Sequence, residues 1–132
     1  MPLLLDASVW VAAALVDDPN QPAAEAVVGS SKRLGALDLT LFEVANVLGR
    51  KHAEPVEANR MCGVIVARCQ RRLVRVDAEL IASGLAVVQE HGLTAYDAAY
   101  VAAARRNGWT LVSLDIADLV SKGLAVAPDA AV

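Results

Sequence analysis

The stretch LLLDASVW at residues 3–10 decides the fold. Its three leucines form a short apolar run of the kind that becomes a buried β-strand. The run stops at Asp6, and Ser8 can cap a helix that continues to about Val16. A buried strand that passes directly into a helix opens an alternating pattern, which is typical of α/β domains with a parallel sheet.

The alternation of strands and helices continues along the rest of the chain. Short apolar or alternating runs predict strands at residues 33–37, 73–76 and 110–113. Capping residues and periodic apolar positions predict helices at residues 22–29, 40–52, 55–70, 77–92, 94–108 and 116–119. We therefore expect an α/β fold, a three-layer α/β/α sandwich with a mostly parallel central sheet. The 132 residues contain no linker or repeat, so residues 1–132 are expected to form one domain.

Composition and charge limit the kinds of function. The formal net charge is -3, so the chain is not expected to bind polyanions through overall charge. Only 4% of residues are aromatic, so stacking on side chains is not expected to dominate a contact with nucleic acid. No apolar run reaches the roughly 20 residues of a membrane-spanning helix. No Lys or Arg precedes Lys32, which argues against a signal peptide, and we expect a cytoplasmic protein without membrane contact.

The two cysteines are expected to be free thiols. Cys62 and Cys69 are seven residues apart on one predicted helix, so two turns separate them. This separation is too long for a disulfide bond. No Cys-x-x-Cys pattern is present, and free thiols in a reducing compartment are the simplest interpretation.

Four carboxylates fall where predicted strands end or predicted helices begin. Asp6 follows the first strand and Asp115 follows the last. Glu43 and Asp97 lie in the first turns of helices that follow strands or loops. In open parallel sheets, ligands bind beyond the carboxyl ends of the strands, so these acids are expected to converge on one edge.

A converging set of carboxylates predicts a metal site. Like charges repel strongly unless a cation neutralises them, and the hard cations Mg²⁺ and Mn²⁺ prefer oxygen ligands. A metal-bound water can provide the attacking hydroxide while the ion stabilises charge on a phosphate. The pattern is therefore compatible with phosphodiester hydrolysis that uses no Ser or His nucleophile.

Each acid also has an ordinary structural interpretation. Thr40 and Glu43 have the spacing of a capping box, T-x-x-E. Asp97 stands three residues after Thr94 and would favour the helix dipole. Asp6 and Asp115 could be helix caps or turn residues. Local patterns leave both interpretations open, and only the convergence of the set favours chemistry.

Four segments together resemble the PIN-domain family, and within it the VapC-type toxins of bacterial toxin–antitoxin pairs. They occur in the family's order and are LLLDASVW at 3–10, LFEVANVL at 41–48, GLTAYDAAYVAAA at 92–104 and SLD at 113–115. The resemblance implies a PIN-like fold and a Mg²⁺- or Mn²⁺-dependent endoribonuclease whose acidic site is Asp6, Glu43, Asp97 and Asp115. It also implies an RNA substrate, a cognate antitoxin and a homodimer.

The resemblance also assigns supporting residues. Ser8 would be an auxiliary polar residue near the metal. Many relatives carry a basic or polar residue where this chain has Ile116, and the nearby Asp118 could be a supporting or alternative ligand. Arg50 and Lys51 follow Glu43 on the same predicted helix and are candidates for RNA contact, although such charges are often only solvated.

Other folds that bind Mg²⁺ through acids fit less well. A receiver domain needs an acidic pair after its first strand, and a haloacid-dehalogenase-type phosphatase needs Asp-x-Asp, whereas residues 6–8 read DAS. No dinucleotide-binding, Walker A or G-x-S-x-G motif occurs. The alternative of a different class is a catalytically inactive PIN-like module that binds a protein partner.

Overall fold

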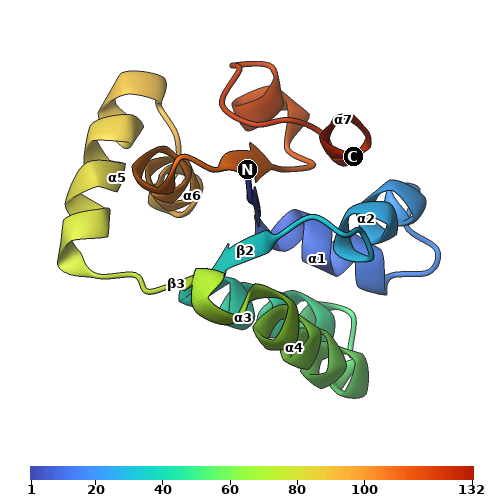
Figure 1. Cartoon of the computed structure of the whole chain (residues 1–132). Helices are drawn as coiled ribbons and strands as arrows, with labels where there is room; N and C mark the ends of the chain where they lie inside the picture. Colours follow the sequence, from blue (N-terminus) through green and yellow to red (C-terminus); the bar gives the residue numbers. More distant parts are fainter.

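The computed structural model describes residues 1–132 and has a four-stranded central sheet (Figure 1). The strands are β1 (Leu3–Leu5), β2 (Leu34–Leu37), β3 (Leu73–Val74) and β4 (Thr110–Val112). Their order is β3-β2-β1-β4, and every pairing is parallel. All four carboxyl ends therefore lie at one edge of the sheet, as the sequence predicts.

Helices connect the strands and cover both faces of the sheet. The α-helices are α1 (Ala7–Ala14), α2 (Gln21–Val28), α3 (Asp38–Val44), α4 (Pro55–Cys69), α5 (Ala78–His91), α6 (Ala95–Asn107) and α7 (Pro128–Ala131). Two π-helical segments, η1 (Ala45–Lys51) and η3 (Ile116–Val120), and a 3₁₀ turn, η2 (Gln70–Arg72), complete the elements. The predicted helix over residues 40–52 thus begins two residues earlier and changes to π-helix at Ala45.

The strand β1 divides the core into two parts because neighbouring side chains of a strand point to opposite faces. Leu3 and Leu5 pack in one cluster with Trp10 of α1, and this cluster also draws on α2, α3 and α4. Leu4 packs in the other cluster with residues of α5 and α6 (Figure 1). The prediction of a three-layer α/β/α sandwich is confirmed.

The helix α6 is buried over most of its length. Residues 98–104 are all buried, and five of these seven are alanines that allow close packing. Gly84 of α5 lies against this helix, where an added Cβ would make an ordinary van der Waals contact of 3.6 Å with the backbone N of Ala99. Thr94 caps the helix by accepting a hydrogen bond from the backbone N–H of Asp97. Only the two end turns of α6 reach the surface, and the first of them carries Asp97 at the carboxyl edge of the sheet.

The cysteines are unpaired, as the sequence predicts. Cys62 and Cys69 are both free. Cys69 is buried, and this burial raises the pKa of its thiol to about 11, which keeps it protonated. None of the helices combines the length and the apolar character that a bilayer crossing requires.

Candidate metal and catalytic site

The four predicted acids occupy the carboxyl edge of the sheet, and Asp97 connects them electrostatically. Burial is the main cause of the raised pKa values of Asp6 and Glu43, and the charge of Asp97 adds to both. The pKa of Asp97 is itself raised, first by partial burial and then by the charges of Asp115 and Asp118. The acids at the ends of β1 and β4 and those on α3 and α6 therefore interact electrostatically. Asp6 and Asp115, at the two ends of this set, are 109 positions apart in the sequence.

Three of the acids lie close enough to hold one ion. Asp97, Asp115 and Asp118 each offer a carboxylate oxygen, and these oxygens lie within 4.8 Å of one another. Asp118 therefore lies close to Asp97 and Asp115, whereas Asp6 and Glu43 are not part of this closest group. The only cationic group within 4.0 Å of these three carboxylates is the Lys122 ammonium, whose Nζ is 4.0 Å from Oδ1 of Asp118. An all-oxygen donor set with so little positive charge nearby fits a hard divalent cation.

Asp6 is fixed by two serines. Its side chain is only 6% exposed, and it accepts hydrogen bonds from the backbone N–H and the hydroxyl of Ser8 and from the hydroxyl of Ser113. Burial raises the pKa of Asp6 to about 6, against the opposing effect of these hydrogen bonds. The carboxylate is thus held in one orientation at the end of β1.

The prediction that Ser8 caps α1 is wrong, because Asp6 is the capping residue. A carboxylate directly after the strand reaches the free N–H groups of α1 first, and Ser8 turns its hydroxyl back toward Asp6. The Ser8 hydroxyl also accepts a hydrogen bond of 3.1 Å from the backbone N–H of Leu114. Ser8 therefore links the residues that follow the carboxyl ends of β1 and β4.

Ser113 is a site residue that sequence reasoning did not name. Its hydroxyl donates to Asp6 and accepts a hydrogen bond of 3.0 Å from the backbone N–H of Asp115. It is completely buried, so it couples two of the acids inside the fold. A polar residue at the end of an apolar strand, two positions before an acid, was the available signal.

Glu43 is held by Tyr100, not by a capping box. The Tyr100 hydroxyl donates a hydrogen bond of 2.6 Å to Oε1 of Glu43 and lies 2.7 Å from the hydroxyl of Thr40. Thr40 is the third residue of α3, and its hydroxyl accepts a hydrogen bond from the backbone N–H of Leu37. The predicted cap at Thr40 is wrong because the helix begins at Asp38. Burial and the charge of Asp97 raise the pKa of Glu43, whereas the Tyr100 hydrogen bond lowers it.

The remaining acids have structural roles as well as site positions. Asp115 caps η3 by accepting a hydrogen bond of 2.9 Å from the backbone N–H of Asp118. Asp97 lies in the first turn of α6, where the helix dipole favours a negative charge. The structural and chemical interpretations of these carboxylates are therefore compatible.

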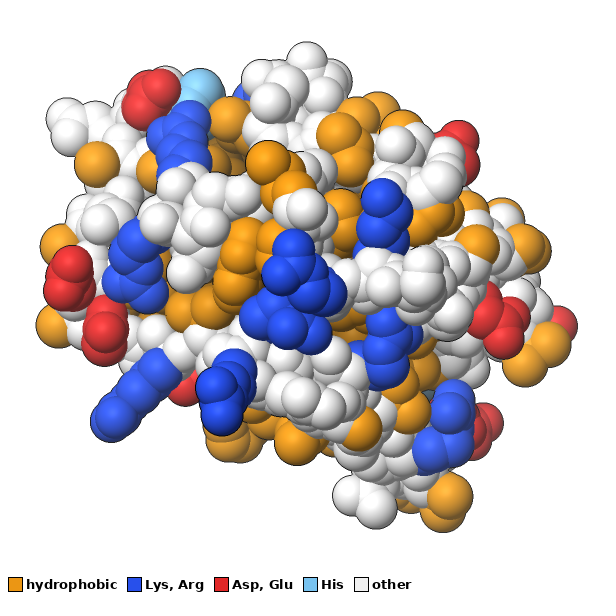
Figure 2. Space-filling view, in the orientation of Figure 1, with side chains coloured by type: hydrophobic (Ala, Val, Ile, Leu, Met, Phe, Trp, Pro, Cys, Tyr) orange, Lys and Arg blue, Asp and Glu red, His pale blue; other side chains and the backbone are white.

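The basic residues lie mostly away from the acids. Arg50 and Lys51 are exposed at the far end of η1, about two turns beyond Glu43. Seven other cations precede strands and so lie toward the amino edge of the sheet: Lys32, Arg33, Arg68, Arg71, Arg72, Arg105 and Arg106. Figure 2 shows Lys and Arg gathered over the middle of one face and acids toward its margins. Most cations thus lie toward the amino edge of the sheet, whereas the site acids lie at its carboxyl edge.

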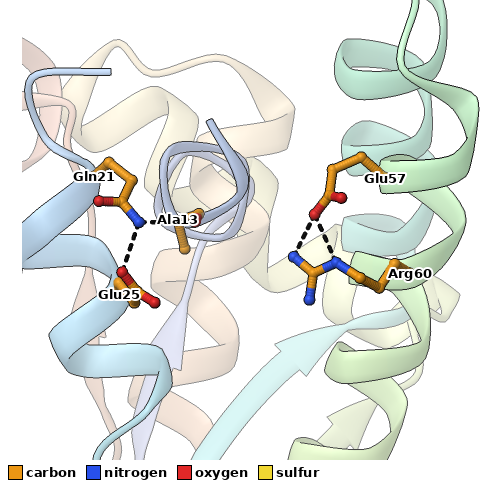
Figure 3. A network of polar contacts seen from close by, with 5 residues as sticks. All are labelled: Ala13, Gln21, Glu25, Glu57 and Arg60. Atoms are coloured by element: carbon orange, nitrogen blue, oxygen red, sulfur yellow. Dashed lines mark hydrogen bonds and ion pairs between the residues drawn. The ribbon is translucent and has the colours of Figure 1, made fainter. Parts of the chain in front are cut away.

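The largest hollow lies elsewhere, between the end of α1, the start of α2 and the start of α4. Its volume is about 770 Å³, and five acids are among its lining residues: Asp17, Asp18, Glu25, Glu54 and Glu57. In Figure 3, Gln21 on one wall bonds to the carbonyl of Ala13 and to Glu25, while Glu57 on the other wall pairs with Arg60. This hollow is a negatively charged surface distinct from the carboxylate site.

Known proteins resemble this chain both in sequence and in fold. A model of the PIN domain matches residues 3–118. Ribonuclease VapC3 of Pyrobaculum aerophilum is 38% identical over 120 residues, which cover 87% of this chain and 90% of that protein. VapC20 of Mycobacterium tuberculosis, described as a sarcin-ricin loop cleaving toxin, superposes with a TM-score of 0.78 at 18% identity, over 92% of this chain and 95% of that one. A toxin–antitoxin complex from Klebsiella pneumoniae gives 0.71 at 16% identity, over 96% and 97%.

Proposed function

Because the chain belongs to the PIN-domain family, we propose that it is an endoribonuclease that hydrolyses RNA phosphodiester bonds and acts as the toxin of a toxin–antitoxin pair. One observation carries this proposal: four acids from distant parts of the sequence share one field at the carboxyl edge of the sheet. A 38% identical relative named as a ribonuclease supports the same activity.

The proposed cofactor is Mg²⁺ or Mn²⁺. Asp97, Asp115 and Asp118 would hold the ion, since their oxygens lie within 4.8 Å of one another. When bound, such an ion supplies an acidified water and neutralises charge that develops on the phosphate. Asp6 and Glu43 would complete the site, each already oriented by hydroxyl donors from neighbouring elements. The hydrogen bond of Glu43 uses Oε1, which leaves Oε2 to accept a proton or to orient a water molecule.

The proposed protein partner is a cognate antitoxin. One solved structure of the same fold is a toxin–antitoxin complex. The acid-lined hollow beside α1 fits a segment that carries Lys or Arg, because opposite charges favour and orient association. Val16 at its border is 85% exposed and offers an apolar contact for the same segment.

The alternative function is a catalytically inactive module that only binds a partner. The presence of all four acids disfavours it, since a binding module has no need to keep mutually repelling carboxylates together. Cleavage of total cellular RNA by the purified protein, with Asp97→Asn as the test variant and the exposed Asp129→Asn as the control, separates the two functions. The nuclease proposal requires that only Asp97→Asn loses cleavage.

A further inference from the structure

The exposed aromatic rings of this chain occur only beside the site. Of the five aromatic residues, Trp10 and Tyr100 are buried and Trp109 is partly buried. The other two, Phe42 and Tyr96, are 79% and 61% exposed. Phe42 directly precedes Glu43, and Tyr96 directly precedes Asp97. A chain that is 4% aromatic thus places each of its exposed rings next to a site carboxylate.

The two rings are carried by helices that meet at the site. Tyr96 stands one turn before Tyr100, so both lie on the same face of α6. Since the Tyr100 hydroxyl bonds to Glu43 and Thr40, that face of α6 is turned toward α3. Phe42 lies on α3 beside Glu43, on the side of the helix that is open to solvent. The rings therefore lie on two helices that each carry a site carboxylate.

The distribution of charge around the site suggests that the protein binds an uncharged part of the RNA. Most cationic side chains lie toward the opposite edge of the sheet, so the chain itself offers few positive charges to phosphates beside the site. The net charge of -3 adds no general attraction for RNA. Nucleobases are the neutral part of RNA, and stacking on an aromatic ring binds any base because every base has a π-face.

We infer that Phe42 and Tyr96 form a base-stacking platform that holds an unpaired stretch of RNA across the carboxylate site. Bases can reach such rings only when they are splayed out of a helix, so the platform selects loops and single strands over duplex RNA. This inference rests on the proposed ribonuclease function and names two residues that would bind its substrate. It also revises the expectation that stacking would be unimportant, since the position of the rings matters more than their number.

Binding to short RNAs tests the platform. The probes are a single-stranded oligoribonucleotide with one 2-aminopurine and a fully paired duplex of the same sequence. Binding is measured with Mg²⁺ on the full chain carrying Asp97→Asn, so that no cleavage occurs. We expect the single strand to bind more tightly than the duplex, with quenched 2-aminopurine fluorescence. Phe42→Ala and Tyr96→Ala should each raise Kd about tenfold, which is about 1.4 kcal/mol, because each removes a ring on which a base stacks.

Matched variants make the result specific. Tyr96→Phe keeps the ring and should keep Kd and quenching, whereas Val56→Ala removes an equally exposed apolar side chain from α4 and should change neither. In the chain with Asp97 intact, the alanine variants should raise KM with kcat within about twofold. Unchanged Kd in both alanine variants, or a changed oligomeric state in place of weaker binding, overturns the platform. RNA binding through the rings without any cleavage by the unmutated chain would instead refute the nuclease proposal alone.

Discussion

The hydroxyl of Tyr100 donates a hydrogen bond of 2.6 Å to Glu43 across 57 residues of sequence. The same hydroxyl lies 2.7 Å from that of Thr40, so buried Thr40 and Tyr100 and half-buried Glu43 form one chain of hydrogen bonds between α6 and α3. Because this hydrogen bond lowers the pKa of Glu43 against the effect of burial, Tyr100 both orients the carboxylate and favours its charged form.

Removing this hydroxyl is expected to weaken catalysis and stability together. Tyr100→Phe leaves the buried Thr40 hydroxyl without this partner, which costs about 1–3 kcal/mol of unfolding free energy. It also raises the pKa of Glu43, so the acidic limb of the pH–rate profile should move to higher pH. The checks are denaturant unfolding and cleavage rates between pH 5 and 8, with Tyr96→Phe as the control. An unmoved pH profile would separate Tyr100 from the function of Glu43.

The role of Glu43 can be separated from helix stability by an isosteric change. Glu43→Gln keeps an oxygen that can accept the Tyr100 hydrogen bond but removes the charge. We expect unfolding free energy within about 1 kcal/mol of the unmutated chain, because the Tyr100 hydrogen bond is kept and the net contribution of a hydrogen bond is about that size. RNA cleavage should fall steeply. Cleavage at an unchanged rate would leave Glu43 outside the chemistry.

Thr40 is expected to behave differently from a simple helix cap. As a cap alone, Thr40→Ala would cost about 1 kcal/mol of stability and leave cleavage largely intact. The contact between Thr40 and Tyr100 adds an effect on Glu43, so the structure predicts a further loss of cleavage. Comparing cleavage rates of Thr40→Ala and Thr40→Ser measures this effect, since Ser restores the hydroxyl.

The order of elements and the four main acids could be predicted from the sequence because their signals are local. Apolar runs end at Asp6 and Asp115, and caps at Asp77 and Thr94 start α5 and α6 as expected. The contacts that orient the acids could not be predicted, because they join residues far apart in sequence. Ser113 reaches Asp6 across 107 residues, and neither residue carries a local pattern that names the other.

Some local geometry also escaped prediction because tertiary packing decides it. The helix α3 begins at Asp38 and not at the predicted Thr40. The Thr40 hydroxyl is instead hydrogen-bonded to the backbone N–H of Leu37 and to the Tyr100 hydroxyl inside the core. The helix α7, in the tail that the sequence left without structure, packs against α2. The roles of Arg50 and Lys51 in RNA contact, and the predicted homodimer, stay predictions.

The raised pKa of Asp6 predicts how stability depends on pH without metal. The folded chain binds this proton with a pKa of about 6, compared with 3.8 for an ordinary aspartate. Folding therefore gains most from Asp6 below about pH 4 and loses up to about 3 kcal/mol as pH rises to 6 and beyond. Unfolding in chelator between pH 4 and 8 should show this decline, and Asp6→Asn should flatten it. A decline of equal size in the variant would assign it to other groups.

Metal binding is expected to offset the repulsion among the acids. Mn²⁺ at about a hundred times its dissociation constant should stabilise the fold by about 2.7 kcal/mol. Asp115→Asn should reduce this response because Asp115 belongs to the closest group of oxygens. Melting curves with and without Mn²⁺ measure it, and Asp129→Asn is the control. A melting temperature that ignores Mn²⁺ in every variant would argue against a shared ion.

Cleavage of RNA as a function of Mn²⁺ concentration tests the central claim most directly. The unmutated chain should show saturable activation by Mg²⁺ or Mn²⁺ and no cleavage in excess chelator. Asp97→Asn should lower the saturated rate by orders of magnitude, because Asp97 offers one of the three carboxylate oxygens that lie close enough to hold an ion. Full activity in excess chelator, or an unchanged rate in Asp97→Asn, would contradict a metal-dependent nuclease built on these carboxylates.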